Sequence, residues 1–354
     1  MSTQRKSIEL DHVTQAFRGP AFSRMGGELI AVDDVSFNLT SEPAQTVSLV
    51  GESGSGKSTI ARIILGLQRH TGGRVTYDGK DIHNLTKEEF QAYRRDVQPV
   101  FQDPYGIFNP FYRVERVFWT AIKKFKLAAS KSKGLSLIEE SLAAVDLRPA
   151  DVLGRYPHQL SGGQRQRVML ARVHMLHPAF IIADEPISML DAAVRVLFLN
   201  ILLDFKQKYG MTTLFITHDL STAYYLGGEV MVLSLGRVVE RGKVDDVMVR
   251  PSHPYTQLLL SSLPVPDPDS RWTRRMVVDE QPDDIRLALR DRCLFADRCP
   301  YAMERCWTAT PDMYDVRTGQ EALCVLYDKS DPLAREKLQV AEARVRADVP
   351  SAHA

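Results

Sequence analysis

The stretch "TVSLVGESGSGKSTIARIILGL" (residues 46–67) decides the fold of this chain. Its β-branched start predicts a strand, its glycine-rich middle a turn and its apolar end a helix. Residues 51–58 fit the pattern G-x-x-x-x-G-K-[ST] in the strand–loop–helix setting that this pattern requires. Backbone N–H groups of such a loop wrap phosphates, and the helix N-terminus adds partial positive charge. The residues predicted to bind a nucleotide here are Gly51, Glu52, Ser53, Gly54, Ser55, Gly56, Lys57, Ser58 and Thr59.

A second apolar stretch, "AFIIADEP" (179–186), supplies two carboxylates where a predicted buried strand ends. Asp184 is placed to hold Mg²⁺, directly or through water, and Glu185 to polarise an attacking water as a general base. An N-cap for the following helix is the structural alternative for Asp184. The phosphate loop in the same chain favours the metal role.

Two further polar residues follow predicted strands. The stretch "TTLFITHD" (212–219) delivers His218 at its end, and Gln102 follows a short apolar run in "PVFQDPYGIFNP". A lone histidine is more often structural than catalytic. Its place after a buried strand of a phosphate-binding protein favours a functional role, whereas Gln102 alone carries no weight.

The stretch "LSGGQRQRVMLAR" (160–172) predicts a second anion site. Ser161, Gly162 and Gly163 present a hydroxyl and backbone N–H groups at the start of a helix. One ATP does not need two such loops from one chain. We therefore expect two chains packed head to tail, with each nucleotide between one chain's phosphate loop and the other chain's SGGQ.

Composition and charge limit the function classes. The 354 residues carry 45 Lys plus Arg against 44 Asp plus Glu, so no global field attracts nucleic acid. The start "MSTQRKSIELDHV" shows no apolar signal region, and no run of 18 apolar residues occurs. We expect a cytosolic protein that does not itself span a membrane and whose thiols stay reduced.

The motifs occur in the order GESGSGKST, Gln102, LSGGQ, IIADE, SMLD and His218, and over residues 8–250 the chain resembles the ATP-binding cassette (ABC) ATPases. The resemblance implies an α/β fold with a RecA-like P-loop NTPase core and an N-terminal antiparallel β patch. It also implies a helical subdomain inserted at about residues 103–170. The nucleotide-binding domain is then expected to span residues 1–250.

The resemblance implies a role for each motif residue, with ATP and Mg²⁺ as ligands. The implied roles are phosphate binding for Lys57, Mg²⁺ binding for Ser58, Asp184 and Gln102, general-base catalysis for Glu185, γ-phosphate sensing for His218, and contacts across a dimer for Asp191, Ser161, Gly162, Gly163 and Gln164. An aromatic residue near the N-terminus is expected to stack on adenine. Phe17 is the first choice and Phe22 the second, because the insertion "RGPAFSRMGGELI" blurs the register.

Residues beyond 250 indicate which group of ABC ATPases the chain resembles. The stretch "RPSHPYTQLLLSSLP" (250–264), followed by a cysteine-containing segment, looks like the tail of oligopeptide/dipeptide importer ATPases. We expect a small C-terminal extension over residues 251–330 and a helical or flexible tail over 331–354. Met189, Ile187 and the stretch "NPFYRVERVFW" depart from the family pattern, which leaves the ATPase intact but puts the imported solute in doubt.

All four cysteines lie in the extension, at Cys293, Cys299, Cys306 and Cys324. Four thiols in a reduced compartment favour a metal over disulfides. Their spacing lacks the C-x₂₋₄-C pairs of structural zinc, and the spacings of iron–sulfur sites vary widely, so chemistry alone leaves both metals open, with buried unliganded thiols as the bland alternative. The resemblance implies a [4Fe–4S] cluster, with zinc second.

The predicted function is ATP hydrolysis that powers a bacterial ABC importer for oligopeptides or dipeptides. The expected partners are a second ATPase subunit, identical or a diverged sibling, two transmembrane permeases and an extracytoplasmic solute-binding protein. The chain would lie peripherally at the cytoplasmic face of the inner membrane. Import of oligosaccharides or another small solute is the alternative, and an exporter subunit or a soluble ABC ATPase acting on DNA or ribosomes is disfavoured.

Overall fold

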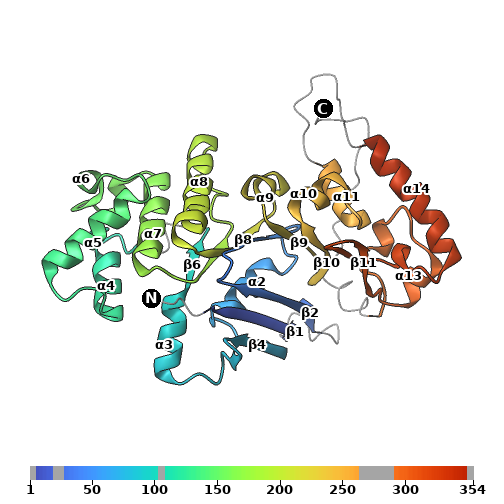
Figure 1. Cartoon of the computed structure of the whole chain (residues 1–354), viewed down its shortest axis with the longest axis horizontal. Coiled ribbons are helices and arrows are strands. Elements are labelled where there is room, and N and C mark those ends of the chain that lie inside the picture. Colours follow the sequence, from blue (N-terminus) through green and yellow to red (C-terminus); the bar gives the residue numbers. More distant parts are fainter. Residues whose placement is uncertain (1–4, 19–27, 103–107, 263–290, 349–354) are drawn as a thin grey trace.

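An eight-stranded sheet forms the centre of the molecule (Figure 1). The computed structural model describes residues 5–18, 28–102, 108–262 and 291–348. The sheet has the order β11–β12–β10–β9–β3–β8–β7–β6, of which β9 to β6 run parallel. The strands are β3 (Thr46–Val50), β6 (Val97–Phe101), β7 (Phe180–Asp184), β8 (Thr212–Thr217), β9 (Glu229–Ser234), β10 (Arg237–Lys243), β11 (Met313–Arg317) and β12 (Gln320–Leu323). Every residue of β3 and β8 is buried, which explains their continuous rather than alternating apolar pattern.

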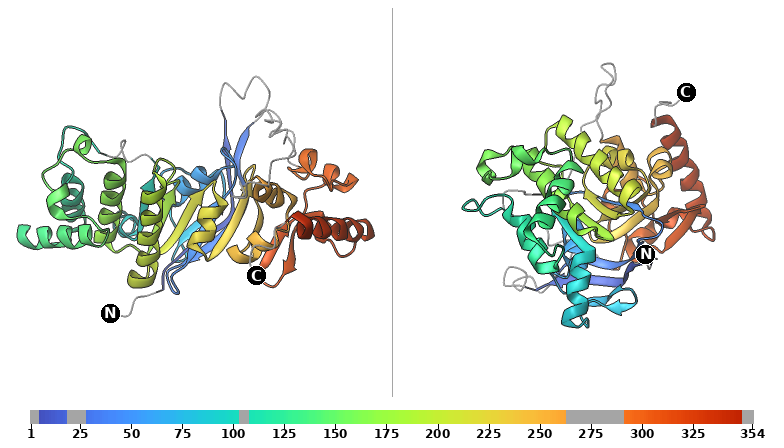
Figure 2. Two further views of the ribbon diagram at one scale, coloured as in Figure 1. Left: turned by 90° about the horizontal axis from the view of Figure 1, so that it is seen from above. Right: turned by 60° about the vertical axis from the view of Figure 1, so that its left-hand side comes forward.

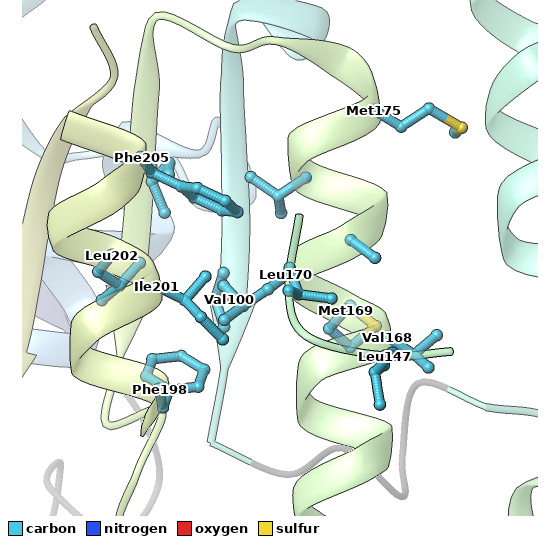
Figure 3. Close-up of a cluster of buried hydrophobic side chains, with 14 of the residues drawn as sticks. Val100, Leu147, Val168, Met169, Leu170, Met175, Phe198, Ile201, Leu202 and Phe205 are labelled. Carbon is cyan, nitrogen blue, oxygen red and sulfur yellow. The ribbon is translucent and has the colours of Figure 1, made fainter. Parts of the chain in front are cut away.

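Helices cover both faces of this sheet. Ile182 of β7 faces the cluster that contains α2 (Lys57–Ile64), whereas Ile181 and Ala183 face the cluster of α7 (Gly162–Leu176) and α8 (Ala192–Tyr209). Figure 3 shows the second cluster, in which side chains of α7 and α8 meet around β6. The remaining helices beside the parallel strands are α9 (Leu220–Leu226) and α10 (Val244–Val249).

A four-stranded antiparallel patch packs on the α2 side of the core. Its order is β2–β1–β4–β5, and its strands are β1 (Ser7–Phe17), β2 (Leu29–Thr40), β4 (Gly72–Tyr77) and β5 (Lys80–Asp81). Ile8, Leu10 and Val13 of β1 are buried in the same hydrophobic cluster as Leu49 of β3. The patch is therefore continuous with the core, and α3 (Lys87–Asp96) connects it to β6.

A group of helices lies between β6 and β7, which are neighbouring parallel strands. The group consists of α4 (Arg116–Phe125), α5 (Lys131–Ala143), α6 (Pro149–Val152) and α7. α4 and α5 approach closely, because a Cβ on Gly134 would lie 2.7 Å from the Trp119 ring. Figures 1 and 2 show these helices at one end of the molecule. The structure confirms the predicted α/β class, the antiparallel patch and the inserted helices.

The C-terminal extension continues the central sheet. β12 pairs with β10 in the register Glu240–Ala322, and β11 and β12 form a hairpin. Its helices are α11 (Pro254–Ser261) and α13 (Glu304–Thr308), followed by α14 (Pro332–Asp348). The buried Glu240 carboxylate accepts hydrogen bonds from the Ser252 N–H and from Gln320 Nε2, both at 2.8 Å, and so joins cassette and extension. In Figure 2 the extension and the inserted helices lie at opposite ends.

None of the helices in the described ranges combines the length and apolar character needed to cross a bilayer.

Candidate nucleotide-binding site

The register of the parallel strands brings the motif residues to one edge of the sheet. Phe101 of β6 pairs with Asp184 of β7, and Asp184 pairs with Ile216 of β8. Val50 of β3 pairs with Thr217. Ligands of α/β sheets bind at the carboxyl ends of the strands. The residues that leave the sheet at that edge are Gly51, Gln102, Glu185 and His218.

Glycines shape the phosphate loop (residues 51–58) by permitting left-handed backbone and close approach. Gly54 has a φ of 78° and Gly56 a φ of 106°. A Cβ on Gly56 would lie 2.1 Å from the Ala31 carbonyl oxygen of β2, and one on Gly51 would lie 2.1 Å from the Leu233 carbonyl oxygen. In the described structure no side chain caps α2 at Gly56, so the first N–H groups of α2 are available to an anion.

The Lys57 ammonium lies inside this loop. Its Nζ donates to the carbonyl oxygens of Gly51 at 2.8 Å and of Glu52 at 2.7 Å. Burial lowers the pKa of Lys57, although the carboxylates of Glu185 and Asp184 oppose the shift. The loop thus holds a buried cation at its centre, in a position to bind phosphate oxygens.

Ser58 and Asp184 meet although 126 residues separate them, with the Ser58 hydroxyl donating to Asp184 Oδ1 at 3.0 Å. Burial raises the pKa of Asp184, and the Ser58 hydrogen bond opposes the rise. A hydroxyl beside a carboxylate is an oxygen donor set that suits Mg²⁺. The pair fits a magnesium ion next to the phosphate loop.

Glu185 and His218 form a second pair at the same edge. Glu185 Oε2 lies 3.4 Å from His218 Nδ1, and the Glu185 side chain is much less exposed than that of His218. Glu185 has a φ of 44°, and its N–H donates to the Ile216 carbonyl at 3.0 Å. The unusual backbone therefore aims a carboxylate out of the strand end, where it can accept a proton from water.

The signature turn (residues 161–164) begins α7. The Ser161 hydroxyl accepts from the Gln164 N–H at 3.2 Å, and Gln164 Oε1 accepts from the Ser161 N–H at 2.9 Å, which forms a capping box. Gly163 packs against α8, because a Cβ there would lie 2.6 Å from Val194 Cγ1. Asp191 caps α8 by accepting from the Val194 N–H at 3.0 Å. In Figure 1, α7 stands with the inserted helices while α2 lies at the centre.

Sequence reasoning missed Gln166, which lies on α7 two residues after the LSGGQ motif. Its buried Nε2 donates to the Phe101 carbonyl at 3.1 Å and to the Pro186 carbonyl at 2.6 Å. It thereby joins the signature helix to the segments that carry Gln102 and Glu185. The repeated pattern "GQRQR" was the signal available in the sequence.

The remaining predicted residues are placed as follows. Phe17 ends β1 and is 37% exposed, so its ring is open to solvent, while Phe22 lies outside the described residues. Gln102 is exposed after β6, and residues 103–107 lie outside the described residues. Which aromatic side chain contacts adenine stays a prediction.

The four cysteines line one small cavity in the extension, together with apolar residues such as Phe295 and Leu326. Within the described residues, no group of three or more His, Cys, Asp or Glu side chains has the arrangement of a metal site. Burial raises the pKa of the thiols of Cys293, Cys324 and, to about 12, Cys299. His253 also lines the cavity, but its Nδ1 accepts from the Tyr255 N–H at 3.0 Å.

Comparison with known proteins agrees with this geometry. A model of the family "ABC transporter" matches residues 32–188, and a model of "Oligopeptide/dipeptide transporter, C-terminal region" matches residues 239–306. A putative peptide import ATP-binding protein of Brucella ovis is 39% identical over 294 residues, which cover 83% of this chain and 91% of the relative. This chain belongs to the ABC transporter ATPases. The dipeptide transport ATP-binding protein DppF of Escherichia coli is 38% identical to the ATPase, over 85% of this chain and 88% of the relative.

Solved cassettes share the fold of the ATPase. The dimeric structure of MJ0796, a bacterial ABC transporter cassette, superposes with a TM-score of 0.58 at 30% identity, over 67% of this chain and 98% of that chain. A dimeric post-hydrolysis state of MJ0796 bound to ADP and phosphate gives the same TM-score at 29% identity. These likenesses confirm the predicted cassette fold and the prediction that the chain is an ATPase.

Proposed function

We propose that this ATPase hydrolyses ATP to power the import of oligopeptides or dipeptides. The observation that carries the proposal is the union, in one chain, of a cassette site and an oligopeptide/dipeptide-type extension that continues its sheet. The peptide and dipeptide transport names of its relatives support the same solute class.

The site residues divide the chemistry among them. Lys57 and the N–H groups of the phosphate loop bind the β- and γ-phosphates, and Ser58 with Asp184 holds Mg²⁺. Glu185 takes the proton of the attacking water, and His218, 3.4 Å away, holds the carboxylate and senses the γ-phosphate. Gln102 links the metal to the permease side, and Phe17 stacks on adenine.

A second ATPase chain completes the nucleotide-binding site. The signature turn of the partner ATPase, whether an identical chain or a sibling, presents Ser161, Gly162, Gly163 and Gln164 or their counterparts, with Asp191 at the dimer contact. Two permeases and a solute-binding protein complete the complex. They hold the ATPase peripherally at the cytoplasmic face of the bacterial inner membrane.

The test of this function is purification of the intact complex with its subunits and co-purified solute identified. Two permeases and a second ATPase should accompany the chain, and a binding protein loaded with peptide should stimulate ATP hydrolysis. The matched control is the same binding protein loaded with an oligosaccharide. Stimulation by the oligosaccharide and not by peptide would contradict the peptide assignment.

We further propose that Cys293, Cys299, Cys306 and Cys324 hold a [4Fe–4S] cluster, with zinc as the alternative metal. The proposal is supported by the four thiols lining one cavity with apolar walls, since four thiolates can hold such a cluster. Their side chains do not have the arrangement of a metal site in the described structure, so they would have to close around the metal on binding. The thiols must lose their protons to bind a metal, so binding has to overcome their raised pKa. When bound, the metal centre would supply folding energy to the extension rather than redox chemistry.

Anaerobically purified protein should be brown and contain near-stoichiometric iron and sulfide, and Cys299→Ser should lose most of both. The same substitution should raise proteolysis within residues 291–348 more than in the cassette, because the metal–sulfur bonds stabilise the extension. Colourless protein that contains one zinc ion would show that the bound metal is zinc and not an iron–sulfur cluster. Protein with neither metal, in which all four thiols react freely while folded, would overturn the metal site.

A further inference from the structure

Two side chains of the C-terminal extension hold the second residue of the phosphate loop. The Glu52 N–H donates to the hydroxyl oxygen of Tyr255, on α11, at 3.1 Å. The Glu52 carboxylate accepts from Arg298, at 3.2 Å from Nη2 to Oε1 and 3.5 Å from Nη1 to Oε2. A two-point contact of this kind fixes the orientation of the carboxylate as well as its position.

These two side chains form one unit with Phe295. The rings of Tyr255 and Phe295 pack edge to face with centroids 5.6 Å apart, and the Arg298 guanidinium lies 5.6 Å from the Phe295 centroid. Tyr255 is 1% and Phe295 5% exposed, so neither ring can move without opening the core beneath it. The unit is therefore a rigid support rather than a pair of surface side chains.

Backbone hydrogen bonds fix this unit within the extension. The Ala296 N–H donates to the Cys293 carbonyl at 3.2 Å, and the Arg298 N–H donates to the Phe295 carbonyl at 3.1 Å. Arg298 directly precedes Cys299, so the turn that carries the guanidinium begins and ends at cysteines of the cavity. The other support, Tyr255, follows the buried N-cap of α11.

Glu52 is thus held both by the extension and by the loop itself, in which the Ser55 N–H donates to the Glu52 carbonyl at 3.2 Å. The Tyr255 hydroxyl oxygen accepts a hydrogen bond from the Glu52 N–H, Arg298 donates to the Glu52 carboxylate, and Lys57 donates to the Glu52 carbonyl at 2.7 Å. A phosphate ligand would take the Lys57 ammonium away from that carbonyl. Glu52 would then be held by the Ser55 N–H inside the loop and by the two contacts from the extension, of which only the latter tie it to the rest of the protein. The loop keeps its phosphate-binding shape during this exchange if Glu52 stays in place.

We propose that Tyr255 and Arg298 are positioning residues of the ATP site, through which the C-terminal extension holds the phosphate loop ready for nucleotide. The role needs neither a metal at the cysteines nor a particular solute, and it rests only on ATP binding by the cassette. Loss of either contact leaves the catalytic pair Glu185 and His218 untouched. It should therefore raise the KM for ATP and change kcat little.

The test measures KM and kcat for ATP in the assembled transport complex. Because the pair is partly exposed, Arg298→Ala should raise KM by about twofold to fivefold, and Tyr255→Phe should also raise it while keeping the ring in place. Arg298→Glu should raise KM further, through repulsion of Glu52. The matched control is Arg305→Ala, since Arg305 directly precedes Cys306 but pairs with Asp328 inside the extension.

Charge reversal separates positioning from loss of folding. The double variant Glu52→Arg with Arg298→Glu should have a KM well below the product of the two single effects, which a merely misfolded extension would not give. A native KM in Arg298→Glu, or an effect equal to that of Arg305→Ala, would overturn the proposal. So would a KM of the double variant that is the product of the two single effects. These KM measurements do not depend on which solute the complex transports, so the test stands even if the peptide assignment is wrong.

Discussion

Glu185→Gln is expected to lower ATP hydrolysis by about 10²- to 10⁴-fold, the usual contribution of a positioned general base. The amide keeps the size and shape of the side chain but cannot accept the proton of the attacking water. The contacts of Lys57 and Ser58 do not involve Glu185, so ATP should still bind. The closed dimer should then accumulate with its nucleotide.

The measurement is single-turnover hydrolysis in the assembled complex, with nucleotide binding followed separately. Glu229→Gln is a suitable control, because Glu229 is an exposed glutamate at the start of β9. Hydrolysis by Glu185→Gln at the native rate would show that another group is the base.

The second large effect comes from the two anion loops acting in different chains. Lys57→Ala removes the phosphate loop's ammonium, and Ser161→Arg fills the signature turn with a bulky cation, so each variant alone should be nearly inactive. In a homodimer, a mixture of the two variants contains pairs with one site whose loops are both native. The mixture should therefore regain ATP hydrolysis well above either variant alone.

The control is Lys57→Ala alone, at the total protein concentration of the mixture, and it should stay inactive. If the partner is a sibling chain, two pairs are compared. Lys57→Ala in this chain combined with the signature change in the sibling damages one composite site, whereas both changes in this chain damage both sites. Full hydrolysis by an isolated monomer with Ser161 replaced would refute the composite site.

The structure brings the residues of the predicted nucleotide site together, because they lie at strand ends and helix starts. A buried parallel strand is a local apolar run, and the first polar residue after it marks the carboxyl edge of the sheet. Asp184, Glu185 and His218 follow such runs, so their meeting at one edge followed from topology. The α/β core and the inserted helices followed from the same motifs.

The contacts of the extension could not be predicted in this way. Glu52 and Arg298 are 246 residues apart, and no local pattern specifies that they pair. The pairing of β12 with β10 and the double hydrogen bond of Gln166 likewise depend on tertiary packing. The choice between Phe17 and Phe22 was blurred by an insertion, since the sequence gives no register across it.

Peptide uptake into proteoliposomes tests the central claim most directly. The vesicles hold ATP and Mg²⁺ inside, and the solute-binding protein and a labelled peptide are added outside. The native complex should accumulate the peptide, and the complex with Glu185→Gln should assemble equally well but accumulate none. Peptide accumulation that is equal in both complexes, or that does not require ATP, would contradict the account.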